Sequence, residues 1–188
     1  MSDVANEASD LRDRRRRRFV VLNLAGGALV LASYAWGALG GGSVMSALWG
    51  GVPESIRPLY VANMCLAAAG YFAFAPYVAF RIDPARRDLL GGAGYGIFEV
   101  WMLLVLLPSA AWLPLTAAMV SAPSAPLWWL VRIDLFLVAI GSLGLLASLA
   151  TLPPPRARGH LAALIGTLPF CLQTVVLDAL VWPAYFPW

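Results

Sequence analysis

The chain has 188 residues, of which 61% are hydrophobic and only 12% are charged, and its formal net charge is +3 at pH 7. Its mean hydropathy of +0.76 lies outside the usual range of soluble globular domains. We therefore expect a chain that is solvated by lipid and has no second, soluble domain. A bilayer core about 30 Å thick is crossed by about 20 apolar residues, so the length predicts an all-α membrane protein with five spans.

The N-terminal residues 1–18 are polar and end in five consecutive arginines, Arg14 to Arg18. We expect this segment to be a disordered cytoplasmic anchor. The net charge is concentrated in this tail beside a span, which argues against nucleic acid as a partner. The rest of the chain, 19–188, is predicted to form one bundle of five transmembrane helices with short loops. The expected spans cover residues 19–39, 58–80, 89–120, 127–152 and 161–182.

The predicted third span is longer than one membrane thickness and contains Pro108 and Pro114. Proline lacks a backbone donor and interrupts a helix. We therefore expect a kink at Pro108, followed by a tilted or re-entrant segment that carries Trp112.

The distribution of arginines predicts the orientation. The tail holds six arginines, residues 81–87 hold three and residues 156–158 hold two, whereas Arg57 alone lies in the segments on the other side. Because positive loops stay in the cytoplasm, we expect the N-terminus inside and the C-terminus outside a plasma or bacterial inner membrane.

Polar residues of several spans are expected at one depth. At about 1.5 Å per residue, Arg132 and Asp134 lie roughly 8–10 Å below the outer surface, and Asp178 and Asn63 lie at a similar depth. Trp112 should reach this layer from a further span. The sequence therefore predicts a polar layer inside the outer half of the bundle.

Charged residues within spans cost at least about 2.5–3.5 kcal/mol each and generally pair. We expect Arg132 to pair with Asp178. The alternatives are that Arg132 extends to the outer headgroups and that Asp178 forms a structural salt bridge or a cap near the end of its helix. Asp134 shares a stripe with Gly141 and Ser148, which predicts that it faces inward against a close neighbour.

Glu99 is expected near the middle of the third span, at the depth of Gln173. One expectation is that the two side chains form a structural hydrogen bond. The alternative is that Glu99 acts as a proton acceptor or binds a cationic or amphipathic molecule. Gly92, Gly96 and Glu99 lie on one stripe, so this helix can pack closely, and a homodimer through the Gly92/Gly96 face is a further expectation.

No metal site or cofactor is predicted. Cys65 and Cys171 lie far apart in apolar runs and are interpreted as unpaired thiols. His160 is the only histidine, and we expect it to be a solvated residue at the start of a helix, so a histidine-based zinc or haem site is improbable. No nucleotide-binding or hydrolase motif occurs in the sequence.

In span number, size and aromatic richness, the chain resembles the tryptophan-rich sensory protein/translocator family. These small five-helix membrane proteins are associated with porphyrin and sterol-like ligands. The region that corresponds to the family's Trp/Pro-rich signature, residues 40–60, contains Pro53 and Pro58 without the matching aromatic pattern. The resemblance therefore assigns no binding residue.

Three functions remain open on the sequence. The favoured one is a non-enzymatic protein that binds or passes a small amphipathic molecule in a polar cavity near the outer face. The second is an intramembrane enzyme for a lipid or isoprenoid, with Glu99 or Asp178 as general acid or base. The third is a packing subunit of a membrane complex. The candidate ligand-binding residues are Asn63, Glu99, Trp112, Arg132, Asp134, Gln173 and Asp178.

Overall fold

The computed structural model describes residues 2–39, 46–86, 89, 92–152 and 158–187. These residues form helices joined by short connections, and none of them belongs to a strand. Within this part of the chain, five helical segments are long and apolar enough to cross a membrane, as the sequence predicted. Arg87 and residues 153–157, which include the predicted cytoplasmic Arg156, lie outside the described residues.

The first four long helices are α1 (Ser2–Leu39), α3 (Arg57–Arg81), α4 (Gly96–Ser121) and α5 (Ala125–Ala150). The fifth apolar segment consists of α6 (Arg158–Cys171), the π-helix η2 (Leu172–Val181) and the short α7 (Trp182–Tyr185). The bounds of α3 and α5 lie close to the predicted spans 58–80 and 127–152.

Local signals explain where α3 and α5 begin. Pro58 and Pro126 lie in the first turns of these helices. A backbone N–H at these positions has no acceptor within the helix, so proline, which lacks the N–H, costs no hydrogen bond there. Ser124 caps α5, because its Oγ accepts a hydrogen bond from the backbone N of Leu127 at 3.4 Å.

Helix α1 is continuous from Ser2, so it includes residues 2–18, for which the sequence predicted a disordered tail. Two arginines of this segment contact the connection after α3. Arg12 Nε lies 3.6 Å from Asp83 Oδ1, and Arg15 Nη1 donates to Pro84 O at 2.9 Å. These contacts hold the basic part of α1 beside the neighbouring helix end.

Helix α4 begins at Gly96, later than the predicted start of the third span. Gly92 and Gly94 precede it with φ angles of +106° and +67°, a left-handed conformation that does not belong to a helix. From Gly96 the chain is one continuous helix through Pro108 to Ser121. The kink at Pro108 and the tilted or re-entrant course after it stay predictions.

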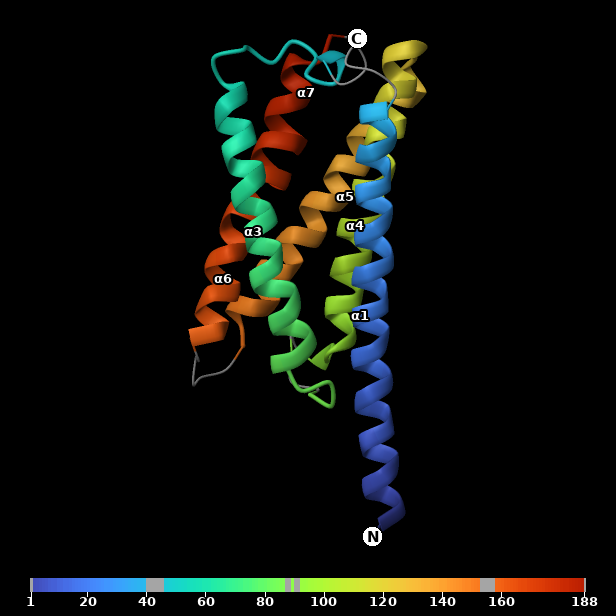
Figure 1. Ribbon diagram of the computed structural model, residues 1–188, viewed down its shortest axis with the longest axis vertical. Coiled ribbons are helices and arrows are strands. Elements are labelled where there is room, and N and C mark those ends of the chain that lie inside the picture. The colour runs from blue at the N-terminus through green and yellow to red at the C-terminus, as the bar shows by residue number, and fades with distance from the viewer. Residues whose placement is uncertain (1, 40–45, 87–88, 90–91, 153–157, 188) are drawn as a thin grey trace.

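The helices form two groups, α1 with α4 and α3 with α6, and α5 contacts both groups (Figure 1). Helix α4 packs along α1 and α5, whereas α3 packs along α6. Helix α5 lies diagonally, with its start beside α4 and its end near the start of α6. The termini lie at opposite ends of the bundle. We call these the N-terminal end, which also holds the turn after α3, and the C-terminal end, which holds the α4–α5 turn.

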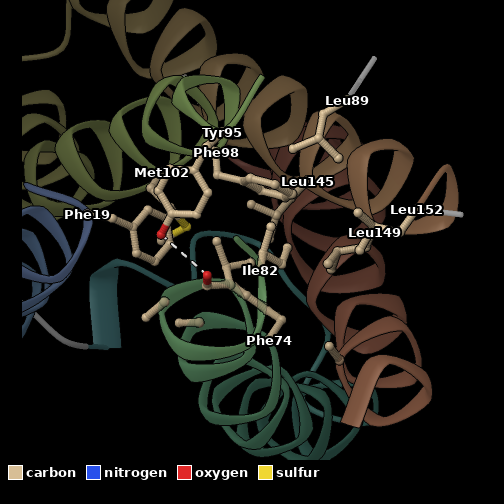
Figure 2. Packing of buried hydrophobic residues seen from close by; sticks show 14 of the residues in the cluster. Phe19, Phe74, Ile82, Leu89, Tyr95, Phe98, Met102, Leu145, Leu149 and Leu152 are labelled. Carbon is tan, nitrogen blue, oxygen red and sulfur yellow. Dashed lines mark hydrogen bonds between the residues drawn. The ribbon is translucent and has the colours of Figure 1, made fainter. Parts of the chain in front are cut away.

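Buried apolar side chains form one cluster toward the N-terminal end. Phe19 of α1 meets Tyr95, Phe98 and Met102 at the start of α4 (Figure 2). The rings of Phe19 and Tyr95 meet edge to face with 5.9 Å between their centroids. This contact fixes the level of α1 relative to α4.

A second apolar cluster lies toward the C-terminal end. Trp128 at the start of α5 stacks on Phe186 with 5.5 Å between ring centroids, and Trp182 packs against Phe186 at 4.7 Å. The indole of Trp182 also donates to Leu48 O at 2.8 Å. The end of the chain is therefore fixed against α5 and the connection before α3.

Glycines allow close approach between two pairs of helices. A Cβ on Gly70 of α3 would overlap the carbonyl oxygen of Gly166 in α6. A Cβ on Gly141 of α5 would lie 2.8 Å from Trp101 O in α4. Asp134, Gly141 and Ser148 are all buried, which confirms the inward stripe that the sequence predicted on α5.

Gly92 and Gly96 do not mediate such packing within the chain. Among the described residues, no atom outside their immediate surroundings lies within 4 Å of a Cβ built at either position. Their predicted role in close packing of the third span is therefore wrong for the single chain. A homodimer through this face stays a prediction.

The contact between α3 and α6 can be tested with a matched pair of glycine variants. Gly70→Ala is expected to lower the free energy of unfolding by about 1–3 kcal/mol, because the methyl group enters a filled interface. Gly27→Ala in α1 meets nothing within 4 Å and is expected to be neutral or stabilising, because alanine favours helix by about 1 kcal/mol. Unfolding in detergent measures both, and equal effects would contradict the contact.

Candidate functional site

Asn63, Gln173 and Asp178 form a chain of hydrogen bonds between α3 and η2, which we call the polar relay. Asn63 Nδ2 donates to Gln173 Oε1 at 3.0 Å, and Gln173 Nε2 donates to Asp178 Oδ1 at 2.8 Å. The exposed fractions of Asn63 and Gln173 are 5% and 7%. Because an unpaired buried amide is costly, these side chains stabilise one another.

The π-helix explains why Gln173 and Asp178 meet. Its hydrogen bonds join residues five apart, as when the backbone N of Trp182 donates to Leu177 O. Residues five apart therefore lie one above the other, whereas an α-helix would turn them about 140° apart. The sequence prediction matched Gln173 with Glu99 by depth alone, and depth does not show which side chains a π-helix aligns.

Side chains supply hydrogen bonds where α6 passes into η2. Asn63 Nδ2 also donates to Pro169 O at 3.1 Å, and Thr174 Oγ1 donates to Phe170 O at 3.0 Å. Backbone groups that leave the α-helical pattern within a membrane need partners of this kind. The polar relay thus has a structural role in the fifth segment.

Tyr60 of α3 bonds to the backbone of the residue that precedes Asp178. Tyr60 Oη donates to Leu177 O at 2.9 Å. Tyr60 was not among the residues predicted from the sequence, although its spacing of one turn from Asn63 places both on one face of α3.

A second group of polar atoms has no hydrogen-bond partner within the described part of the chain. The group comprises Trp112 Nε1, Thr116 Oγ1 and Asp134 Oδ2, and we call these three residues the polar trio. Thr116 is 0% exposed and Asp134 is 7% exposed. Trp112 and Thr116 lie one turn apart on α4. Pro123, in the turn between α4 and α5, is the same number of residues away from Trp112 as from Asp134. Because α4 and α5 run antiparallel, the three residues lie at neighbouring levels along the helix axes.

The polar relay and the polar trio adjoin one buried cluster. Trp112 packs edge-on against Trp182, with 5.8 Å between ring centroids. The sequence neighbours of Asp134 and Asp178 pack in the same cluster as Trp182. Both groups thus lie toward the C-terminal end. Thr116 was missed by the sequence analysis, because a single threonine in an apolar helix usually bonds to its own backbone.

Arg132 does not pair with Asp178, and that prediction is wrong. Its guanidinium carbon lies 5.8 Å from the ring centroid of Trp128 and 5.4 Å from that of Phe136. Within the described residues it forms no ion pair, and its Nε has no hydrogen-bond partner. The prediction matched depths along two helices, whereas pairing also requires that the helices turn these side chains toward each other.

Glu99 lies at the N-terminal end and not in the middle of a span. It occupies the first turn of α4, where its Oε2 lies 3.3 Å from Arg18 Nη2 of α1. The predicted hydrogen bond to Gln173 is therefore wrong. The left-handed glycines delay the start of α4, and this shift moves Glu99 toward the helix end.

His160 also differs from its prediction, because it is buried. A ring nitrogen lies 2.7 Å from Leu149 O, and the ring stacks on Tyr77 with 5.7 Å between centroids. In the part of the chain that the structure describes, no three His, Cys, Asp or Glu side chains are grouped to hold a metal ion. His160 thus serves the packing of α6 against α5 and α3.

Comparisons with known proteins found no matching family model, no matching curated protein and no matching solved structure. The candidate site therefore rests on the geometry of this chain. It consists of the polar relay and the polar trio. Glu99 lies far from it, at the opposite end, and Arg132 lies on another face of α5.

A pair of double-mutant cycles should separate the observed contact from the one expected on the sequence. Gln173→Leu and Asp178→Leu share a hydrogen bond, so we expect a coupling energy of about 0.5–3 kcal/mol. Arg132→Leu and Asp178→Leu share none, so their effects should add within about 0.5 kcal/mol. Unfolding in detergent gives both values. A larger coupling for the second cycle would contradict the polar relay.

Proposed function

We propose that this chain is a multi-pass protein of the plasma or bacterial inner membrane that binds a small amphipathic molecule near the outer face. The N-terminal end of the bundle lies in the cytoplasm, and the C-terminal end lies toward the outside. The observation that carries the ligand proposal is the polar trio, whose buried donors and acceptor have no partner among the described residues.

The outward-facing surface supports insertion into lipid. Large apolar side chains are exposed along the helices: Leu24 is 69% exposed, Leu31 72% and Phe72 74%. Such a surface in water would favour aggregation. Hydrocarbon solvates it without penalty, because lipid tails are as apolar as leucine.

The arginines support the proposed orientation. Those of α1 lie at the N-terminal end together with Arg81 and Arg158, whereas Arg57 lies toward the C-terminal end. Positive charge is retained on the cytoplasmic side during insertion.

Reporter fusions test this orientation. Alkaline phosphatase requires disulfides and is active only in an oxidising compartment. A fusion after Trp188 is expected to be active, and a fusion after Asp83 is expected to be inactive. Green fluorescent protein at the same two positions serves as the control with the reverse pattern. Activity after Asp83 but not after Trp188 would contradict the orientation.

The chemistry of the polar trio favours a ligand with a hydroxyl head. The indole N–H of Trp112 only donates, an ionised Asp134 only accepts, and the Thr116 hydroxyl does either. A ligand hydroxyl donates one hydrogen bond and accepts up to two, so its capacity matches Asp134 as the acceptor and Trp112 and Thr116 as donors. Ordered water has the same capacity, which makes water the competing occupant.

The surroundings supply contacts for an apolar body. Trp112 adjoins a cluster that includes Met119, Trp128 and Trp182. Apolar and aromatic walls with a few placed polar groups are typical of small-molecule sites. An alcohol with a hydrocarbon or ring body fits this combination.

The geometry favours binding over the two other functions. Glu99 is paired with Arg18 at the opposite end, and Asp178 accepts a hydrogen bond from Gln173. Both carboxylates are thus engaged, whereas a general acid or base needs to reach a substrate proton. A purely structural bundle would be expected to pair the polar trio internally.

Thermal unfolding with matched ligands tests the proposal. We expect farnesol to raise the melting temperature of the detergent-purified protein, whereas farnesene, which lacks the hydroxyl, should not. Cholesterol and cholestane form a second pair. Trp112→Phe and Thr116→Val each remove one hydrogen bond worth about 0.5–1.5 kcal/mol, so binding of the alcohol should weaken roughly 2- to 12-fold.

Trp101→Phe is the matched control. The indole of Trp101 already donates to Ser148 Oγ at 2.9 Å, so this variant should lose stability and keep the ligand-induced shift. An equal loss of the shift in Trp101→Phe and Trp112→Phe would contradict the site. If neither alcohol shifts the melting temperature beyond its hydrocarbon, the polar trio holds water only and the ligand proposal is overturned.

A further inference from the structure

An open groove runs between α1 and α4 at the N-terminal end. Its volume is about 590 Å³. Guanidinium groups line one part of it, and aliphatic side chains line the other part. The lining comprises Arg14, Arg17, Arg18 and Glu99, followed along the helices by Val21, Leu22 and Leu103.

We propose that this groove binds an anionic phospholipid of the cytoplasmic leaflet. The phosphate lies at the arginines, and the start of an acyl chain lies along the aliphatic side chains. This inference rests on the proposed membrane insertion and orientation but not on the ligand site at the other end of the bundle.

The charge of the groove is positive after its internal pairs are counted. Arg18 is engaged with Glu99, the carboxylate of the groove, at 3.3 Å. Arg14 lies 3.6 Å from Asp10, but both side chains are exposed, 74% and 70%, and such pairs are weak. Arg17 forms no ion pair within the described residues. A planar guanidinium matches a phosphate with two parallel hydrogen bonds.

The length of the groove matches the edge of a bilayer. From Arg14 to Leu22, α1 rises roughly 12 Å at about 1.5 Å per residue. The headgroup layer on one side of a membrane is about 5–8 Å thick. The arginines therefore reach the headgroups when Leu22 lies in hydrocarbon. A free phosphate would occupy the arginines alone, whereas a phospholipid fills both parts.

A second groove at the same end does not have this character. It lies between α1 and the end of α3 and has a volume of about 460 Å³. Its lining holds three arginines, Arg12, Arg16 and Arg81, against two carboxylates, Asp13 and Asp83, and Arg12 is paired with Asp83. The groove beside α4 has three arginines and only one carboxylate in its lining, so its lining carries one more net positive charge and is the better site for an anion.

Native mass spectrometry of the full chain in mixed micelles tests the proposal. The probes are dioleoylphosphatidylglycerol and dioleoylphosphatidylcholine, which have the same acyl chains and differ in net charge. We expect the protein to retain the anionic lipid preferentially. Arg14→Gln/Arg17→Gln removes two arginines from the groove and keeps the Arg18–Glu99 pair, and its preference should fall roughly 30-fold.

Arg81→Gln/Arg158→Gln is the matched control, because it removes the same charge from exposed positions outside this groove. It should keep the preference. Far-UV circular dichroism and detergent unfolding establish that each variant is folded. An equal loss in both double variants, or equal retention of the two lipids by the wild type, would overturn the site.

Inorganic phosphate provides the remaining arm of the experiment. We expect it to give little thermal stabilisation compared with phosphatidylglycerol. If phosphate stabilises the protein as much as the lipid does, the groove is an anion site and the lipid proposal is overturned. The farnesol measurement concerns the other end of the bundle, so failure of one proposal does not imply failure of the other.

Discussion

The fifth apolar segment depends on side-chain hydrogen bonds that satisfy a backbone outside the α-helical pattern. Hydrocarbon offers no donors or acceptors, so each backbone group released within a span needs a protein partner. Asn63 and Thr174 donate to carbonyls in the last turn of α6, directly before the π-helix, and Tyr60 donates to one within the π-helix. The bonds of Asn63 and Tyr60 fix the rotation of α3 against this segment. The same π-helical pattern aligns Gln173 with Asp178. One arrangement therefore provides hydrogen-bond partners for the backbone and forms the polar relay.

Helix α5 runs diagonally and holds the bundle together, because it contacts both α4 on one side and α6 on the other (Figure 1). Gly141 brings it close to the backbone of α4, while Ser142 Oγ lies 2.7 Å from Thr174 Oγ1 of η2. Asp134 is buried on the same helix, and its Oδ2 has no hydrogen-bond partner among the described residues, whereas Asp178 accepts a hydrogen bond from Gln173. The two carboxylates thus differ in how far the described part of the chain satisfies them.

The two ends of the bundle differ in their chemistry. At the N-terminal end, guanidinium groups of α1 contact carboxylates and a carbonyl of neighbouring segments, as in Arg18–Glu99 and Arg12–Asp83. Arginine suits an interface of this kind, because it is charged at all relevant pH values and binds phosphate as readily as carboxylate. At the C-terminal end, aromatic rings and a few buried polar atoms dominate. The fold thus combines an arginine-rich end with an end where a few polar groups are buried among aromatic rings.

The sequence by itself determined the five apolar helices, the approximate bounds of α3 and α5, and the inward stripe of Asp134 on α5. These properties depend on composition, length and periodicity along a single helix. Only the tertiary structure decided which polar groups meet. Left-handed glycines moved Glu99 to the end of α4, and the π-helix joined Gln173 to Asp178. Depth in a membrane follows from the rise per residue of one helix, whereas pairing depends on the rotation of each helix and on its hydrogen-bond pattern, which its neighbours determine.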